Sequence, residues 1–186
     1  MNVVLREPWT VARFLDWEDR QEGKHEFDGT QIIDMTGGSR AHQRIVANLL
    51  RWFEDNLDPE RFDAIQEMRI DIRGKIRYPD MAIVHAPVEE TDRTLRDALV
   101  VFEVLSDETA ERDLGPKLAH YLRLPSINRY VTIDQRQVAI TSRERTPSGW
   151  TQVDLTSGSL TLPEVGAVLP RDAIYRRVRL HRDAGG

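Results

Sequence analysis

The sequence contains no cysteine, which excludes disulfides, thiolate zinc sites and cysteine nucleophiles. It also has no run of about 18 apolar residues, and no basic segment followed by a short apolar one. These absences predict neither a membrane span nor a signal peptide, so we expect a cytoplasmic protein. No repeat, low-complexity tract or linker rich in Pro, Gly or Ser divides the 186 residues, which predicts a single domain over 1–186.

Several common functional motifs are missing as well. No pair of histidines has the spacing of a zinc site, and no HExxH pattern occurs. Gly37-Gly38 is not followed by the Gly-Lys-Ser/Thr of a phosphate loop, and no Ser/His/Asp arrangement stands out. The chemistry therefore has to come from other residues.

The chain has little excess positive charge. Its formal net charge of −5 argues against a sequence-independent nucleic-acid binder, which needs clustered Lys and Arg to neutralise phosphates. The exception is residues 171–182, with five arginines and one acid. We expect a solvated, partly frayed tail there, and a patch that contacts phosphates is the alternative.

The pattern of apolar residues predicts helices and strands in a mixed order. Helical spacing favours a short helix within 9–17 capped by Thr10, and a long one over 39–57 capped by Ser39. A hairpin is expected over 25–35, turning at Asp28-Gly29. Strands are expected at 64–72, 76–84, 99–105, 127–134, 137–142 and 150–155, with a helix inside 106–124 and a mostly irregular C-terminus. This order predicts an α+β or α/β fold, a sheet flanked by helices.

Two acidic residues lie in or beside apolar strands. In Val100–Leu105 every residue except Glu103 is apolar, and a buried carboxylate is costly unless a cation pairs with it. Asp80 follows Pro79 and begins the apolar run 81–84. On neighbouring strands the two carboxylates would converge on a hard divalent cation such as Mg²⁺. The alternatives are an arginine partner for Glu103, or a strand that faces solvent at that residue.

A lysine downstream has the spacing to join these acids. Asp113, Lys117 and Tyr121 follow one another at four-residue steps, on one face of a helix. Lys117 could then reach the carboxylates and orient a nucleophilic water; an exposed Asp113–Lys117 pair is the alternative. Gly115-Pro116 implies either that the helix begins near Asp113 or that it is kinked there.

These residues, together with others in the same order, resemble the Uma-type family of restriction endonucleases, a branch of the PD-(D/E)XK nuclease superfamily. The matching residues are His25–Gly29, His42, Tyr78-Pro79-Asp80, Ile83-Val84, Phe102–Ser106, Asp113, Lys117, Tyr121 and 127–134. The resemblance covers about residues 10–170. It leaves 171–186 as the basic tail.

The resemblance implies a restriction-endonuclease-like core that hydrolyses phosphodiester bonds of DNA with Mg²⁺, for which Mn²⁺ could substitute. Asp80 and Glu103 would be metal ligands, the Val104 carbonyl a third, and Glu26 an acidic residue at the edge of the site. The superfamily's lysine lies two residues after the second acid, where this chain has Leu105, so Lys117 on the next helix takes that role. Restriction-type nucleases also suggest a homodimer by analogy.

The chain departs from the family pattern at two further positions, His25 and Val131. We expect a packing effect near the site from the first and little effect from the second. His42 could bond across the site or contact a phosphate, or could be a partly exposed residue of a helix cap. A nuclease-like module with weak or no catalysis, binding nucleic acid or protein, is the alternative function.

Overall fold

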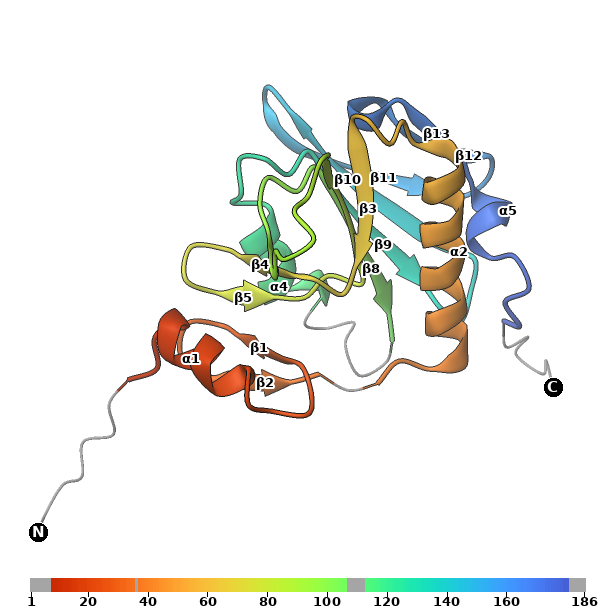
Figure 1. The fold of residues 1–186 in the computed structure, drawn as a ribbon. Helices are drawn as coiled ribbons and strands as arrows, with labels where there is room; N and C mark the ends of the chain where they lie inside the picture. The colour runs from red at the N-terminus through yellow and green to blue at the C-terminus, as the bar shows by residue number, and fades with distance from the viewer. Residues whose placement is uncertain (1–7, 36, 107–112, 181–186) are drawn as a thin grey trace, which may run out of the picture.

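A computed structural model describes residues 8–35, 37–106 and 113–180, which form two main sheets, a separate hairpin and several helices (Figure 1). The six-stranded sheet has the order β11-β10-β9-β8-β6-β3. Its strands are β3 (Phe62–Gln66), β6 (Met81–His85), β8 (Val100–Leu105), β9 (Arg129–Asp134), β10 (Ile140–Thr146) and β11 (Gly149–Leu155). β8 and β9 are parallel, and the other neighbours are antiparallel. The mixed sheet flanked by helices confirms the predicted fold class.

The five-stranded sheet has the order β2-β1-β5-β4-β7. Its strands are β1 (His25–Phe27), β2 (Ile32–Asp34), β4 (Arg69–Asp71), β5 (Ile76–Arg77) and β7 (Thr94–Leu95). The predicted first hairpin is confirmed as β1–β2. Its turn is held by the Asp28 side chain, which accepts from the N–H groups of Thr30 and Gln31, while Gly29 takes φ +97°.

Both predicted N-terminal helices are present with the predicted caps. Helix α1 (Val11–Glu18) has Thr10 as N-cap, and α2 (Arg40–Asn56) has Ser39. In each case the cap's side chain accepts a backbone N–H from the first turn. Two shorter helices follow, α4 (Pro116–Tyr121) and α5 (Arg171–Ile174). None of the helices in the described ranges is long and apolar enough to cross a membrane.

Two predicted strands are each divided between the two sheets. Residues 64–72 form the end of β3 and all of β4, and residues 76–84 form β5 and most of β6. The prediction of continuous strands is therefore wrong. The chain leaves the six-stranded sheet at Glu67, whose φ of +50° is incompatible with a strand, and returns to it after Pro79, which has no N–H for a ladder. The two crossings lie together, because the Glu67 N–H donates to the Asp80 carbonyl at 3.3 Å.

A C-terminal hairpin is present that was not predicted from the sequence. β12 (Ser159–Leu162) and β13 (Ala167–Pro170) pair in antiparallel register around a short 3₁₀ helix, η1 (Pro163–Val165). β11 is thus not the last strand. Each strand of the hairpin is only four residues long and one contains a proline, which obscures the alternation of buried Leu160, Leu162 and Leu169.

Helices and the smaller sheet cover the two faces of the six-stranded sheet. Ile45, Leu49 and Phe53 of α2 pack on one face, together with the β12–β13 hairpin and α5. Tyr121 of α4 and Ile70 of β4 pack on the other. A third cluster joins α1 to β1 and β5. The site therefore lies where α4 and the smaller sheet meet the larger one.

The basic C-terminal segment begins as packed structure, so the prediction of a solvated tail is wrong for its first residues. Ile174 has no exposed surface and packs against the α2 side of the core. The buried Asn48 amide on α2 donates to the carbonyls of Ile174 and Arg176, both at 2.8 Å. Residues 181–186 lie outside the described ranges.

Asn48 should therefore contribute measurably to stability. Asn48→Ala leaves two carbonyls without their donor, and we expect it to lower the free energy of unfolding by about 1–3 kcal/mol. Asn56→Ala is the matched control, because its exposed amide bonds within the same helix, and should change stability by less than about 0.5 kcal/mol. Urea denaturation measures both, and equal effects would contradict the assignment.

Candidate active site

The alternation of strand β8 directs Glu103 toward α4. Val100, Phe102 and Val104 pack on the α2 face, and Val101 packs on the α4 face. Since side chains two apart share a face, Glu103 lies on the α4 side with Val101. Its side chain is 2% exposed. Glu103 is therefore a buried acid, and the alternative that the strand faces solvent there is wrong.

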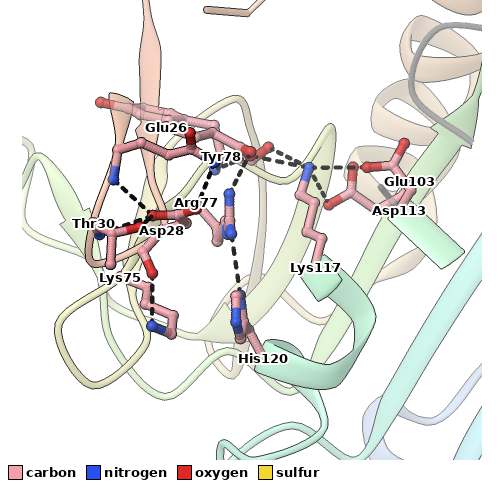
Figure 2. Close-up of polar contacts among 11 residues, drawn as sticks. Glu26, Asp28, Thr30, Lys75, Arg77, Tyr78, Glu103, Asp113, Lys117 and His120 are labelled. Carbon is pink, nitrogen blue, oxygen red and sulfur yellow. Dashed lines mark hydrogen bonds and ion pairs between the residues drawn. The ribbon is translucent and has the colours of Figure 1, made fainter. Parts of the chain in front are cut away.

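Lys117 supplies the cation for this acid. The connection between parallel strands β8 and β9 passes through α4, which brings its first turn over β8. Lys117 Nζ lies 2.8 Å from Glu103 Oε1, 3.2 Å from Glu26 Oε1 and 3.6 Å from Asp113 Oδ1. It also donates to the Tyr78 carbonyl at 3.2 Å. Figure 2 shows the ammonium among these groups, so the partner of Glu103 is this lysine and not an arginine.

The sequence left open whether the helix begins near Asp113 or is kinked at Gly115-Pro116, and the structure has features of both. Asp113 and Leu114 are helical, Gly115 departs from helical geometry, and α4 resumes with Pro116 at its first position. The chain is thus interrupted between Asp113 and Lys117. Both side chains still face the same site and are 3% exposed, so the exposed ion pair is excluded. The preceding residues 107–112 of the predicted turn lie outside the described ranges.

Asp80 is held at the start of β6 by two donors. The last β6–β8 pair is Met81 with Phe102, so Asp80 lies beyond the ladder. Its Oδ2 accepts the Val104 N–H at 2.6 Å, and its Oδ1 lies 3.1 Å from His42 Nε2. Because the N–H and carbonyl of one strand residue point the same way, the Val104 carbonyl also faces the site. Asp80 and Glu103 line one cleft.

Glu26 joins the site from the smaller sheet. Its carboxylate has no exposed surface; Oε2 pairs with Arg77 Nη1 at 2.9 Å, and Oε1 accepts the Tyr78 N–H at 3.2 Å. The same Oε1 contacts Lys117. The structure thus brings Glu26, Asp80, Glu103 and Lys117 together, with Glu26 behind the lysine and away from the mouth of the site.

A cleft of about 490 Å³ opens over these residues. Asp80, Glu103, Val104, Asp113 and Lys117 line it, and Glu26 does not. The opposite wall comes from the start of α2 and the residues before it, which are Gly37, Gly38, Ser39, His42 and Gln43. A Cβ on Gly38 would lie 2.5 Å from His42 Nδ1, so glycine allows the imidazole its place beside Asp80.

The electrostatics of the cleft are dominated by crowded carboxylates. Burial raises the pKa of Glu103 well above its ordinary value; Lys117 opposes this, whereas the charges of Asp113 and Asp80 reinforce it. Burial alone would lower the pKa of Lys117, but its carboxylate neighbours raise it, so it stays charged. Burial also opposes the charged form of His42, yet the hydrogen bond and charge of Asp80 raise its pKa. The cleft therefore favours cations.

Three further residues lie at this site that were not among the metal ligands or catalytic residues expected from the sequence. Asp113 was noted for its helical spacing and His42 as a residue that could bond across the site, and Arg77 was not singled out. Helical spacing was the available signal for Asp113. No sequence signal reveals that Arg77 reaches Glu26, since their contact depends on pairing between β1 and β5.

The donors in the cleft fit a hard divalent cation. Within the described ranges, no three His, Cys, Asp or Glu side chains are already gathered as a metal cage. Mg²⁺ needs less, because it usually takes one or two protein carboxylates and keeps several waters. Glu103 Oε1 and Asp113 Oδ1 are buried, and their cationic neighbour is Lys117, whose Nζ lies 2.8 Å and 3.6 Å from them. Such oxygens suit a cation.

His120 gives the site region a pH-dependent stability. Burial and then the charge of Arg77 lower its pKa from 6.5 to about 4, so the unfolded chain binds more protons between these values. The contribution of His120 to the free energy of unfolding should be fully present above pH 6.5 and decrease as the pH falls toward 4. His120→Asn keeps an acceptor for Arg77 without titrating, and should flatten this part of the profile. Urea denaturation between pH 4 and 7.5 measures it; parallel profiles would contradict the prediction.

Comparisons with known proteins show which family the chain belongs to. A sequence model of the Uma2 family, described as "Putative restriction endonuclease", matches residues 11–170. Two uncharacterized Synechocystis proteins are similar: slr1290 is 30% identical over 169 residues (88% of this chain, 89% of that protein), and sll1609 is 28% identical over 141 residues (73% and 80%). The fold matches a crystal structure of a protein from Anabaena variabilis, titled a putative nuclease of DUF820, with TM-score 0.74 and 17% identity, over 90% of this chain and 98% of that one. The chain therefore belongs to the Uma2 family, the family described as putative restriction endonucleases.

Proposed function

We propose that this chain is a Mg²⁺-dependent DNA endonuclease that hydrolyses phosphodiester bonds through a PD-(D/E)XK-type site. The observation that carries the proposal is the buried Lys117–Glu103 pair beside Asp80 in one cleft. An acid, a second acid on the adjacent strand and a lysine are the parts that this chemistry requires. Membership in a family described as restriction endonucleases supports DNA as the substrate, and a homodimer, cutting both strands, remains a proposal by analogy.

The proposed metal ligands are Asp80, Glu103 and the Val104 carbonyl. All three residues line the cleft, and all offer the oxygen donors that Mg²⁺ or Mn²⁺ prefers. When bound, such an ion lowers the pKa of a water and stabilises negative charge on a phosphoryl oxygen. His42 and the Val104 N–H hold the Asp80 carboxylate in place.

Lys117 is the proposed catalytic cation of the protein itself. Its ammonium lies against Glu103 and stays charged at neutral pH, so it can donate to a phosphate oxygen or orient the attacking water. The lysine arrives from α4, whereas the usual strand position holds Leu105. Glu26 contacts the lysine from behind and supports its charge.

The alternative is a nuclease-like module with weak or no catalysis, binding nucleic acid or protein. One observation favours it: the charged groups satisfy one another. Lys117 has three carboxylates around it, and both oxygens of Asp80 already have partners. This pairing inside the cleft, together with the net charge of −5, weighs against tight binding of DNA phosphates there.

Metal binding tests the ligand set directly. Isothermal titration of the wild type with Mn²⁺ should show one binding site. Asp80→Asn should weaken the affinity for Mn²⁺ at least about 10-fold, because such ions are usually held by only one or two protein carboxylates and the variant loses one of them. Asp63→Asn, on the exposed side of β3, is the matched control and should bind like the wild type. Equal affinity in all three proteins would contradict Asp80 as a ligand.

Cleavage tests the activity. Plasmid, linear duplex, branched and single-stranded DNA are incubated with Mg²⁺ or Mn²⁺. We expect the wild type to cut at least one substrate, and Lys117→Met to lower kcat by about 10²–10⁴ through loss of a catalytic cation. Glu103→Gln should abolish cutting. Activity that survives in Glu103→Gln would indicate a contaminant, and no cutting of any substrate would favour the non-catalytic module.

A further inference from the structure

Arg77 is a buried cation next to the site that the proposed chemistry does not use. It lies on β5, beside β1 in the smaller sheet, and its side chain is 1% exposed. Arg77 does not line the cleft, so it does not meet a substrate there. Its role must therefore run through its neighbours.

Those neighbours connect Arg77 to Lys117 by two routes. One route is Glu26: Arg77 Nη1 pairs with Oε2 at 2.9 Å, and Lys117 Nζ contacts Oε1 at 3.2 Å. The other is α4, because Arg77 Nη2 lies 3.1 Å from Nδ1 of His120, three residues after Lys117. Figure 2 shows Arg77 between Glu26 and His120, with Lys117 on the far side of the carboxylate. The contacts form a closed loop between the smaller sheet and α4.

The chemistry of His120 agrees with this loop. Arginine has no acceptor, so the contact requires a lone pair on Nδ1 and the proton on Nε2. Burial and the charge of Arg77 lower the pKa of His120 to about 4, which keeps the ring neutral and able to accept at neutral pH. The planar guanidinium of Arg77 thus contacts Glu26 and His120 at the same time. The ammonium of a lysine, which is a compact point charge, would not bridge both.

The position of Lys117 depends on such contacts more than that of a lysine on a strand would. A lysine on β8 would be fixed by the sheet, but α4 is six residues long and follows a break at Gly115. Three carboxylates surround the ammonium, and Glu26 is the one whose other oxygen is clamped by Arg77. The position of Glu26 therefore decides how far Lys117 is drawn toward Glu103 and the cleft.

We infer that Arg77 is a positioning residue that sets the place of the Lys117 ammonium through Glu26 and His120. The inference rests on the proposed function for its catalytic meaning, and on geometry alone for the placement itself. A simple counter-ion role for Arg77 would stabilise the fold without affecting Lys117, and the test has to separate the two.

The kinetic test uses Arg77→Lys, which keeps the positive charge but loses the guanidinium that contacts Glu26 and His120 at the same time. We expect kcat on the cleaved DNA to fall about 10²-fold, the effect of a displacement near 1 Å, with KM changed by less than about 3-fold. In a Lys117→Met background, Arg77→Lys should cause no further loss, because it acts through that lysine. Additive losses would overturn the inference. His120→Asn, which keeps the acceptor, should stay within about 3-fold of wild type, whereas His120→Leu should lower kcat.

A second readout needs no activity. The chain has three lysines, Lys24, Lys75 and Lys117, so in ¹⁵N-lysine NMR the Lys117→Met variant identifies the buried ammonium. Arg77→Lys adds a fourth lysine, and the double variant Arg77→Lys/Lys117→Met distinguishes the new signal from that of Lys117. We expect the Lys117 signal to shift or broaden in Arg77→Lys and His120→Leu, and to stay in place in His120→Asn. An unchanged signal in folded Arg77→Lys would overturn the inference. If the wild type cuts no DNA, the proposed function fails, and the NMR result still decides the placement.

Discussion

The buried pair of Lys117 and Glu103 is the interaction on which the site depends. Taking each ion out of water costs several kcal/mol, so the pair persists because each charge is satisfied at close range. Glu103 is 2% exposed and Lys117 is 3% exposed, with 2.8 Å between their charged atoms. An apolar β8 and an α4 that crosses above it are needed to create this arrangement. Much of the fold around the cleft serves to bring these two elements together.

The division of the chain between two sheets places the other site residues around the same cleft. Glu67 and Pro79 mark the crossings, and Asp80 lies where the chain returns to the larger sheet. Arg77 remains in the smaller sheet beside Glu26. The cleft therefore lies at the junction of the sheets, with the Asp80 and Glu103 carboxylates on one side and the buried pair of Arg77 and Glu26 on the other.

The sequence pointed to the residues that line the cleft, but not to the buried contacts behind them. Glu103 stood out because charge interrupts an apolar strand, and Lys117 because of its helical spacing from Asp113; both signals are local. The strands 64–72 and 76–84 were predicted as continuous because periodicity does not reveal a change of sheet at Glu67 or Pro79. The β12–β13 hairpin was too short to give a clear alternation. Contacts such as Arg77 with Glu26 depend on strand order, which one sequence does not determine.

The central claim is that the two acids of the cleft hold one divalent ion. Anomalous diffraction from crystals soaked in Mn²⁺ tests it most directly. We predict one strong peak in the cleft, within bonding distance of the Asp80 and Glu103 carboxylates. A cleft without a peak, in crystals where Mn²⁺ is bound elsewhere, would contradict it.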